Sequence, residues 1–298
     1  KSKIKLKSER ILSGDSVNRI SAENIYSLSN FPSANNSAFD GFAINSKDTV
    51  KLNKNNIRKF KIIKNLAAGD NPYIKTTTSF STIEVMTGAL INKPFDTVIP
   101  VENINFFPTK KKPKYIILNN KIKKNNNIRF IGSDYKKGEK VINKGEIIKP
   151  SHVLAFKTLG IEKILVKKMP KIVFFTTGNE ISNSKNIPKW KVRNSNNYYL
   201  KSYLKNFPIN FLDSKILRDN DKEKFYNEIN KNLKKDTDII ITSGAVSKGK
   251  FDFVPEIIKK FKINNFFKGV LIRPGKPILF AKFKNYFCRR LHSWVKGF

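Results

Sequence analysis

The sequence predicts an α/β protein whose second half is built on a parallel sheet. One observation is a continuous β-branched run at 239–242 that breaks into small residues and precedes a helix-like segment at 253–261. Such a run is typical of a strand buried on both faces of a parallel sheet. A second apolar strand, 172–175, also ends in a glycine-bearing turn. Strand, glycine turn and helix in this order favour a ligand pocket at the carboxyl ends of the strands, although an ordinary βα turn has the same pattern.

The composition excludes several classes of protein. The 298 residues are enough for two or three domains, and the hydrophobic fraction of 39% is sufficient for buried cores. No apolar run approaches a membrane span, and the start lacks the apolar segment of a signal peptide. The single cysteine, Cys288, excludes an internal disulfide and a multi-cysteine zinc cluster. We therefore expect a cytoplasmic protein without a membrane partner, and the absence of an initial Met indicates that the natural start is missing.

The formal charge of +36 is high enough to raise the question of nucleic acid binding. Most of this charge is Lys spread along the chain, and the abundant Lys, Asn and Ile all have AT-rich codons. We favour genome composition as the cause and expect no specific nucleic acid partner. A nucleic-acid binder is the alternative that the charge alone supports. In either case a basic surface attracts small anions.

Residues 45–124 are expected to be β-rich, whereas the first thirty residues have only a weak pattern. Ser21 is a candidate N-cap for a short helix at 22–28. The segment 31–44 is rich in Pro and Asn and is expected to be extended and turning, with Asp40-Gly41 as a tight turn before a strand. Asp40 is either an ordinary turn residue or a carboxylate presented on a rigid loop. Further strands are expected at 57–63, 82–86, 95–102 and 114–118.

Residues 125–170 are expected to form turns, short strands and one helix. Pro150 is a favourable first residue for a helix that runs to about Leu159, and Gly160 is a candidate C-cap. His152 falls in the first turn of this helix, where a lone histidine is more often structural than a ligand.

From residue 171 onward the pattern is typical of βαβ units, with strands at 172–175, 209–212, 266–272 and 278–281 and helices at 198–206 and 222–233. Three loops are expected to leave the same sheet edge: 176–180, 243–252 and 273–277. Together they offer glycine backbone, hydroxyls, carboxylates, Arg273 and Lys276. This set suits a phosphate or oxyanion, with a divalent metal held by carboxylates. The alternative is that these charges are simply solvated.

Several short segments carry a resemblance to a known family. The segment 36–43 is similar to N-S-A-M-D-G-Y-A, the stretch 243–252 to S-G-G-V-S-V-G-x-x-D, and 274–277 to P-G-K-P. The other similar segments are Ala68-Gly69, Met86-Thr87-Gly88-Ala89, 96–102, 129–134, 177–181, Asn194-Ser195-Asn196 and Arg218-Asp219-Asn220. In this order they resemble the motifs of the MoeA family, the molybdopterin molybdenumtransferases, to which the gephyrin E domain belongs. Their number and order, from about residue 18 to residue 288, make the resemblance highly specific.

The resemblance implies three domains: a discontinuous linking α+β domain at 1–41 and 125–168, a β-rich lid domain at 42–124, and a molybdopterin-binding α/β domain with a parallel sheet at 169–298. It also implies a homodimer, with the cleft between the α/β domain of one subunit and the β-rich region of the other. That arrangement would bring Asp40 and Thr87 to a site built on the second half of the chain.

The resemblance further implies that the protein inserts molybdate into adenylylated molybdopterin and releases AMP in a Mg²⁺-dependent step. The candidate catalytic residues are Asp40, Thr87, Asp134, Glu180, Asp219, Asp252 and Lys276. The candidate cofactor-binding residues are Thr177, Gly178, Ser195, Ser243, Gly244, Ser247, Gly249 and Arg273. Glu180 and Asp252 are the candidate ligands of Mg²⁺, which would polarise the phosphoanhydride. Lys276 and Arg273 would meet the pterin phosphate or molybdate.

The chain also departs from the family pattern. Asn179, Asn194 and Asn220 stand where the family has Asp, and each removes a candidate metal ligand or base. After Cys288 the family continues into a G-L-P-G-N-P loop, whereas here 289–298 has a different composition. We expect a frameshift at this point and hence a C-terminally truncated chain. The alternatives to an active enzyme are a catalytically impaired fragment and a non-catalytic binding or scaffold module of the same fold.

Overall fold

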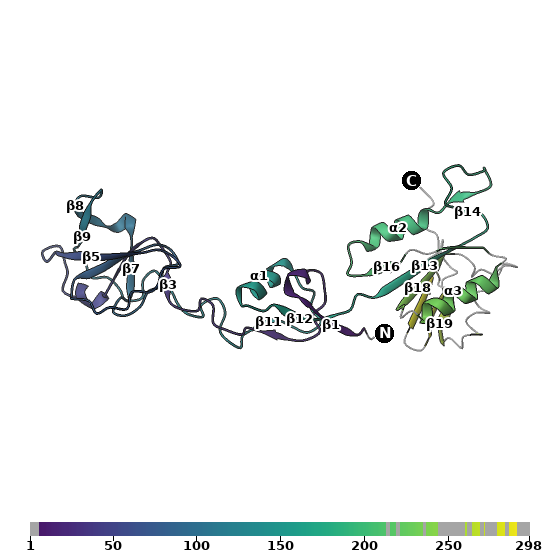
Figure 1. Cartoon of the computed structure of the whole chain (residues 1–298), viewed down its shortest axis with the longest axis horizontal. Coiled ribbons are helices and arrows are strands. Elements are labelled where there is room, and N and C mark those ends of the chain that lie inside the picture. Colours follow the sequence, from purple (N-terminus) through teal and green to yellow (C-terminus); the bar gives the residue numbers. More distant parts are fainter. Residues whose placement is uncertain are drawn as a thin grey trace. The chain divides into compact units, whose positions relative to one another are not determined.

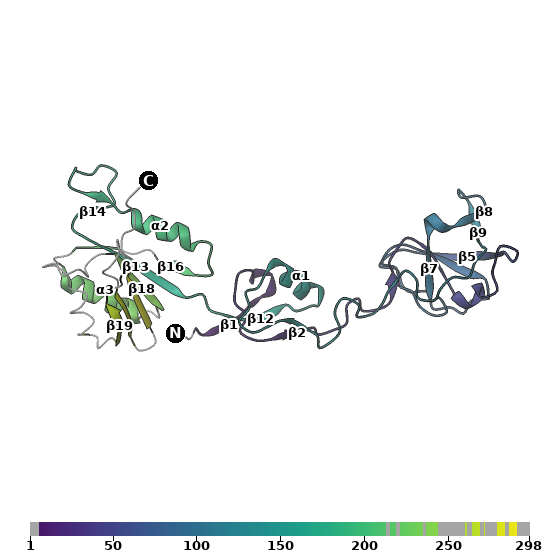
Figure 2. The same ribbon diagram turned by 180° about the vertical axis from the view of Figure 1, so that it is seen from behind.

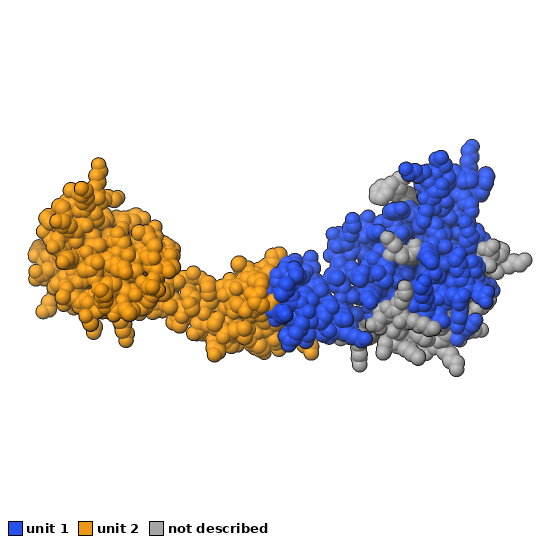
Figure 3. Space-filling model, in the orientation of Figure 1, with its two compact units in different colours: residues 1–23, 145–149, 163–298 blue, residues 24–144, 150–162 orange. Residues whose placement is uncertain are grey.

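The computed structural model describes residues 6–212, 215–218, 221–234, 237–243, 260, 264–268, 271, 279–283 and 286–290. The chain divides into two compact units, which Figure 3 colours separately. Unit 1 consists of 1–23, 145–149 and 163–298, and unit 2 of 24–144 and 150–162. The mixture of helices and sheets confirms the predicted α/β fold class. The finer division into three domains stays a prediction.

Unit 1 is organised around a seven-stranded sheet (Figure 1). Its strands, in spatial order, are β16 (Asn210–Leu212), β13 (Lys171–Thr177), β18 (Ile239–Ser243), β21 (Tyr286–Arg290), β20 (Leu279–Phe283) and β19 (Asn264–Lys268), while β17 (Ile216–Leu217) also pairs with β13. The pairings of β13 with β16, β17 and β18, and of β18 with β21, are parallel. The pairings of β20 with β19 and β21 are antiparallel. The sheet is therefore mixed, and its parallel part contains the two strands predicted from apolar runs.

Two helices cover opposite faces of β13, because successive side chains of a strand alternate between faces. Phe174 packs with Leu200 of α2 (Ser195–Leu204). The ring of the next residue, Phe175, lies 6.0 Å from that of Phe225 of α3 (Lys222–Lys234), measured between centroids. Both views show α2 and α3 on either side of β13 and β18 (Figures 1 and 2). Each buried phenylalanine contributes about 1.5 to 3 kcal/mol through the apolar area that it removes from water.

Three smaller features complete the description of unit 1. β1 (Ser8–Leu12) pairs antiparallel with β12 (Lys163–Lys167). A short 3-10 helix, η1 (Ser13–Asp15), follows β1. Within the connection from β13 to α2, β14 (Ile181–Ser182) runs parallel to β15 (Val192–Arg193).

Unit 2 contains a six-stranded sheet with the spatial order β7 (Thr97–Pro100), β4 (Gly41–Ile44), β6 (Ser81–Val85), β5 (Arg58–Leu66), β9 (Pro113–Leu118) and β8 (Asn105–Pro108). Only the β5–β6 pairing of this sheet is parallel. Alternation along β4 divides the core into two clusters, with Phe42 and Ile44 in one and Ala43 in the other. The β-rich character expected for residues 45–124 is confirmed.

The remaining elements of unit 2 are short. β2 (Ile25–Tyr26) pairs with β11 (Lys140–Ile142), and β3 (Asn36–Ser37) pairs with β10 (Ile128–Arg129). The 3-10 helices are η2 (Ser46–Thr49) and η3 (Val101–Asn103). Helix α1 (Pro150–Thr158) has the predicted start, and Gly160 beyond its end has a φ of +71°. The Ile161 N–H donates to the Phe156 carbonyl, which is the 6→1 bond of a glycine-terminated helix.

The prediction of a short helix at 22–28 is wrong. Its backbone donors bond to other segments: the N–H of Ala22 donates to the Leu165 carbonyl, and that of Ser27 to the Glu139 carbonyl. The Ser21 hydroxyl donates to the Glu23 carbonyl and caps no helix. The segment forms β2 instead, because pairing with distant strands outweighs a weak local helix preference.

Candidate functional site

Three parallel strands of unit 1 end at one edge of the sheet. Thr176 of β13 is in register with Ser243 of β18 on one side and with Ile216 of β17 on the other. The ends of β13 and β18 therefore lie side by side at this edge, as the sequence predicts. In open α/β sheets, ligands bind outside the carboxyl ends of the strands. We therefore take this edge as the candidate site of unit 1.

Two predicted cofactor-binding residues are joined directly at this edge. The hydroxyl of Thr177 donates a hydrogen bond to the backbone carbonyl of Ser243, and both residues are buried. The bond fixes the end of β13 against the end of β18. Thr177 thus has a positioning role, because its hydroxyl proton is already used within the protein.

Gly178 and Glu180 form the first turn beyond β13. Gly178 has a φ of +143°, a conformation that L side chains rarely adopt, and its N–H donates to the Leu217 carbonyl at 3.1 Å. A Cβ at this position would lie 2.7 Å from each carboxylate oxygen of Glu180. The glycine therefore leaves the space that this carboxylate occupies. Glu180 is exposed, and among the described residues no cation forms an ion pair with it.

Two basic residues that are not among the predicted site residues lie beside this turn. Lys191 donates from Nζ to the backbone carbonyl of Asn179, and Arg218 donates from Nη1 to the same oxygen at 3.3 Å. Both side chains bring positive charge next to the residue that precedes Glu180. Arg218 belongs to a recognisable motif, so its motif was the available signal. Lys191 carries no signal in a chain with 59 Lys and Arg residues.

Asn194, immediately before α2, is a structural residue. It is 5% exposed, its side-chain oxygen accepts from the Thr176 hydroxyl at 2.9 Å, and its amide nitrogen donates to Asn183 at 3.1 Å. A carboxylate could not make the second of these bonds, since it has no donor. These two hydrogen bonds account for an amide side chain at residue 194, whether or not an Asp at this position would bind a metal. Its neighbour Ser195 is the exposed first residue of α2.

Unit 2 brings Asp40 and Thr87 into direct contact. One oxygen of Asp40 accepts from the Thr87 backbone N–H at 2.6 Å and from the Thr87 hydroxyl at 2.8 Å. These bonds, the backbone one foremost, lower the pKa of Asp40 below its ordinary value of 3.8. Both residues are exposed, so Asp40 is an ionised carboxylate held on a fixed loop.

The glycine that follows Asp40 serves the fold. Gly41 begins β4, where its pairing with β7 brings the backbone very close. A Cβ at Gly41 would lie 2.0 Å from the carbonyl oxygen of Ile99, which is part of the sheet and cannot move aside. In the Asp-Gly pair, Asp40 is therefore the candidate functional residue, and Gly41 is required for the close packing of β4 against β7.

Asp134 is paired within its own motif. Its carboxylate accepts from the Arg129 guanidinium, and the Ser133 hydroxyl donates to it at 3.1 Å. The hydrogen bond from Arg129 is the main cause of a lowered pKa at Asp134. The same guanidinium lies 5.5 Å from the centroid of the Phe31 ring. Asp134 is thus an anchor for Arg129 as well as a candidate cleft residue.

The two-residue strand β3 connects these motifs. The Ser37 N–H donates to the Ala89 carbonyl at 2.8 Å, and the Gly88 N–H donates to the Ser37 carbonyl at 2.9 Å. On its other side, Asn36 is in register with Arg129. The motifs at 36–43, 86–89 and 129–134 therefore adjoin one another in unit 2.

The remaining predicted site residues lie outside the described residues. They are Asp219, Gly244, Ser247, Gly249, Asp252, Arg273 and Lys276. Most of the predicted helix at 253–261 and the loop at 273–277 also lie there. Within the described ranges, no three His, Cys, Asp or Glu side chains gather into a metal-binding group. No helix in that part of the chain is long and apolar enough to cross a membrane.

Comparisons with known proteins match both halves of the chain. Residues 1–160 match the MoeA N-terminal region (domain I and II), and residues 173–288 match a probable molybdopterin binding domain. The MoeA protein of Pyrococcus horikoshii OT3 has a similar solved structure, with a TM-score of 0.77, 28% identity, and coverage of 95% of this chain and 69% of that one. A second MoeA structure, at 24% identity and a TM-score of 0.81, supports the fold.

Curated relatives named molybdopterin molybdenumtransferase are similar over most of the chain. The Haemophilus influenzae protein is 32% identical over 276 residues, which cover 92% of this chain and 65% of that protein. The Staphylococcus epidermidis protein is 31% identical over 294 residues, covering 96% of this chain and 67% of that protein. The chain thus spans about two thirds of the length of these relatives.

The fold, the sheet edge and the domain matches define a protein of molybdenum cofactor biosynthesis, with a β-rich region joined to an α/β domain of the molybdopterin-binding type. More particularly, the chain belongs to the MoeA family, whose curated members are the molybdopterin molybdenumtransferases.

Proposed function

We propose that this chain inserts molybdate into adenylylated molybdopterin and releases AMP. The observation that carries the proposal is the match to the MoeA family over both halves of the chain. The chemistry agrees, because molybdate and a phosphorylated pterin are anions and the chain carries a formal charge of +36. The test is molybdate-dependent AMP release from the adenylylated substrate.

In this proposal the pterin-phosphate end lies at the sheet edge where β13, β17 and β18 end. The Thr177–Ser243 bond fixes the two strand ends at the site, and Gly178 leaves the space in which the Glu180 carboxylate lies. Ser195, exposed at the start of α2, is available to donate a hydroxyl hydrogen bond. Gly244, Ser247, Gly249, Arg273 and Lys276 complete the proposed pocket.

A Mg²⁺ ion fits the donor that the described residues supply. Mg²⁺ is usually held by one or two carboxylates together with waters and substrate phosphates, rather than by a complete protein cage. The carboxylate of Glu180 is exposed and has no ion-pair partner among the described residues, which matches this habit, and Asp252 is the second proposed ligand. When bound, the ion would polarise the phosphoanhydride. Lys191 and Arg218, which donate to the Asn179 carbonyl, hold the turn that presents Glu180.

We also propose that the chain acts as a homodimer in which unit 2 of one subunit serves the sheet edge of the other. Asp40 and Thr87 support this idea, because a carboxylate held by two hydrogen bonds at an exposed loop has no evident task in the core of its own unit. Asp134 and Arg129 adjoin this pair through β3. The Asp40 carboxylate of one subunit would then position the substrate that is bound at the sheet edge of the other subunit.

A non-catalytic binding module is the second candidate. One observation favours it: Asn179 stands where the family has Asp. Measurement of AMP release distinguishes the two candidate functions. A binding module would retain adenylylated molybdopterin without converting it, whereas the proposed enzyme would release AMP when molybdate is added.

A further inference from the structure

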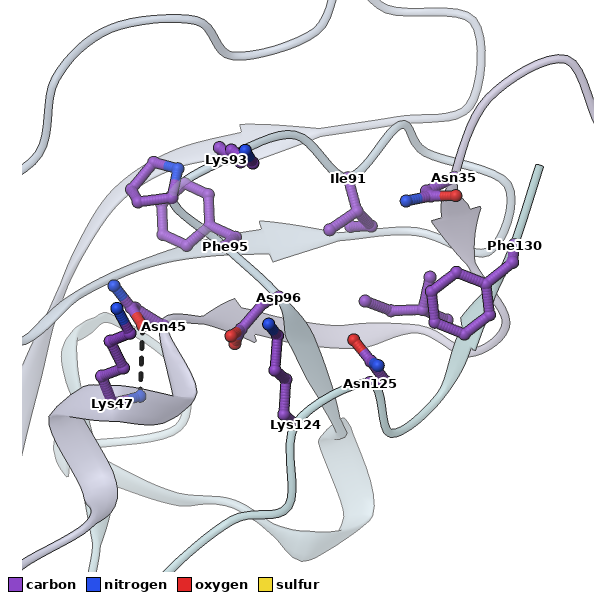
Figure 4. Close-up of a pocket in the computed structure, with 12 residues that line it drawn as sticks. Asn35, Asn45, Lys47, Ile91, Lys93, Phe95, Asp96, Lys124, Asn125 and Phe130 are labelled. Atoms are coloured by element: carbon purple, nitrogen blue, oxygen red, sulfur yellow. Dashed lines mark hydrogen bonds between the residues drawn. The ribbon is translucent and has the colours of Figure 1, made fainter.

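Unit 2 contains a hollow of about 560 Å³ that the proposed function does not use (Figure 4). Its volume is within the range of small-molecule sites. The hollow is lined by segments far apart in the sequence, from Asn35 to Phe130. Asp40, Thr87 and Asp134 are not among its lining residues. The hollow is therefore a separate feature of unit 2, and its chemistry can be considered by itself.

The hollow carries an excess of positive charge. Lys47 of η2, Lys93 between β6 and β7, and Lys124 beyond β9 all line it. Among the described residues, none of these three lysines forms an ion pair with a carboxylate. The lining contains one acid, Asp96, whose oxygens accept from the backbone N–H of Ser46 at 2.7 Å and from its hydroxyl at 2.9 Å. The carboxylate is engaged, so the ammonium groups are available to an anion.

Positive charge alone would not define a site, because lysines are common on this chain. The second feature is a set of three amide side chains, Asn35, Asn45 and Asn125. The oxygen of Asn35 accepts from the Ile131 N–H at 2.9 Å, and that of Asn45 accepts from the Lys47 N–H at 3.1 Å. The amides of Asn35 and Asn45 are thereby oriented, and each keeps its NH₂ group for another acceptor. Fixed amide donors suit the ring oxygens and nitrogens of a heterocycle.

The third feature is an apolar wall. Ile91 and Phe95 are buried beneath the hollow, while the Phe130 ring, 39% exposed, lies at its side. An exposed aromatic ring beside oriented amides is a surface on which a flat heterocycle can stack. The hollow thus combines a place for a ring with a place for an anion.

A second, smaller hollow fixes where the anionic group would lie. It has a volume of about 310 Å³ and shares Lys47 and Lys124 with the first. Lys121 and Lys123 also line it. Lys47 and Lys124 therefore stand at the boundary of the two hollows, and Figure 4 shows the Lys47 side chain beside Asn45 and the Lys124 side chain reaching toward Asp96.

We propose that this hollow binds a phosphorylated heteroaromatic compound of mononucleotide size. The ring lies against Phe130 and the amides of Asn35 and Asn125, and the phosphate lies between Lys47 and Lys124. This site is independent of the molybdate reaction proposed for the sheet edge.

The test uses calorimetric titration of the whole chain with GMP, because AMP is a product of the proposed reaction and would report on both sites. We expect one GMP per chain, and an affinity at least about tenfold weaker in the variant K47Q/K124Q, which loses two charge-assisted contacts. K110Q/K111Q, which removes two lysines of the same unit outside both hollows, is the matched control and should bind as the unaltered chain does.

Two further ligands test the two halves of the site separately. Guanosine lacks the phosphate and ribose 5-phosphate lacks the ring, and each should bind at least about tenfold more weakly than GMP. The proposal is overturned if GMP does not bind at millimolar concentration, or if ribose 5-phosphate binds as tightly as GMP. Equal affinities of K47Q/K124Q and K110Q/K111Q for GMP would overturn it as well.

Discussion

Asp40 accepts two hydrogen bonds from Thr87, from the backbone N–H at 2.6 Å and from the hydroxyl at 2.8 Å, although the residues are 47 positions apart. Each residue belongs to a motif of the MoeA family, and unit 2 joins the two motifs through β3. The carboxylate is held in one orientation while it stays exposed. Such a group is suited to position a substrate rather than to stabilise a core.

The first prediction concerns the Thr87 hydroxyl. In T87A the pKa of Asp40 should rise but remain below 3.8, because the backbone N–H of residue 87 is the larger cause of its lowering and is kept. T87S retains the hydroxyl and should leave the pKa nearly unchanged. NMR titration of the Asp40 carboxyl measures both. An unchanged pKa in T87A would show that the hydroxyl bond does not form in solution.

The same pair predicts a pH dependence of stability. The folded-state pKa of Asp40 lies below the ordinary value of 3.8, so the stabilisation is fully present well above that pH. It is lost as the pH falls through the lowered folded-state pKa. In D40N this part of the acid dependence should be absent, which denaturant unfolding at a series of pH values would measure.

A second prediction concerns Arg129, whose hydrogen bond is the main cause of the lowered pKa of Asp134. R129A should raise that pKa toward 3.8, and R129K should raise it less because a positive charge remains nearby. Added salt should raise the pKa in the unaltered chain, since the pair is exposed to solvent. An Asp134 titration that is insensitive to both R129A and salt would contradict the pairing.

A third prediction separates backbone strain from contact at Gly178. G178A should destabilise unit 1 by about 1 to 3 kcal/mol, because φ is +143° there. Gly138 also has a positive φ, of +83°, but a Cβ there would meet nothing within 4 Å. G138A is therefore the control for strain alone.

The contact with Glu180 should appear in activity rather than in stability. The carboxylate ends an exposed, flexible side chain and can move aside, so G178A should lose no more stability than the strain predicts. Displacing Glu180 should lower activity by about 10- to 100-fold, as expected when a metal-ligand position is disturbed. Full activity of a folded G178A would argue against the proposed role of Glu180.

A fourth prediction tests whether two subunits share a site. D40N alters unit 2 and E180Q alters unit 1, and each alone should be nearly inactive. After dissociation and random mixing, half of the dimers are heterodimers, and each has one intact site of two. The mixture should recover about a quarter of the unaltered activity. If both residues served a site within one subunit, mixing would recover nothing.

The sequence predicts the parallel part of the unit 1 sheet well because Ile172 to Phe175 and the run at 239–242 are buried almost throughout. It does not predict β1, whose burial shows no clear alternation, or β12, a five-residue strand that begins and ends with lysine and buries only Ile164 and Val166. The error at 22–28 has a different cause, because its backbone bonds to Leu165 and Glu139 are not local.

The candidate site shows the same division. Thr177, Gly178 and Ser243 follow apolar strands, so their common edge could be predicted. The role of Lys191 could not be predicted, because it lies 12 positions from Asn179 in the sequence and resembles any other lysine of the chain. The hollow near Phe130 has no local signal at all, because its lining comes from scattered segments.

The most direct test of the central claim is the release of AMP from adenylylated molybdopterin by the purified, folded chain with Mg²⁺, measured with and without molybdate. The account predicts release that rises with molybdate concentration and falls by about 100-fold or more in E180Q. AMP release that is absent, or that is the same without molybdate, from a chain shown to be folded would contradict it.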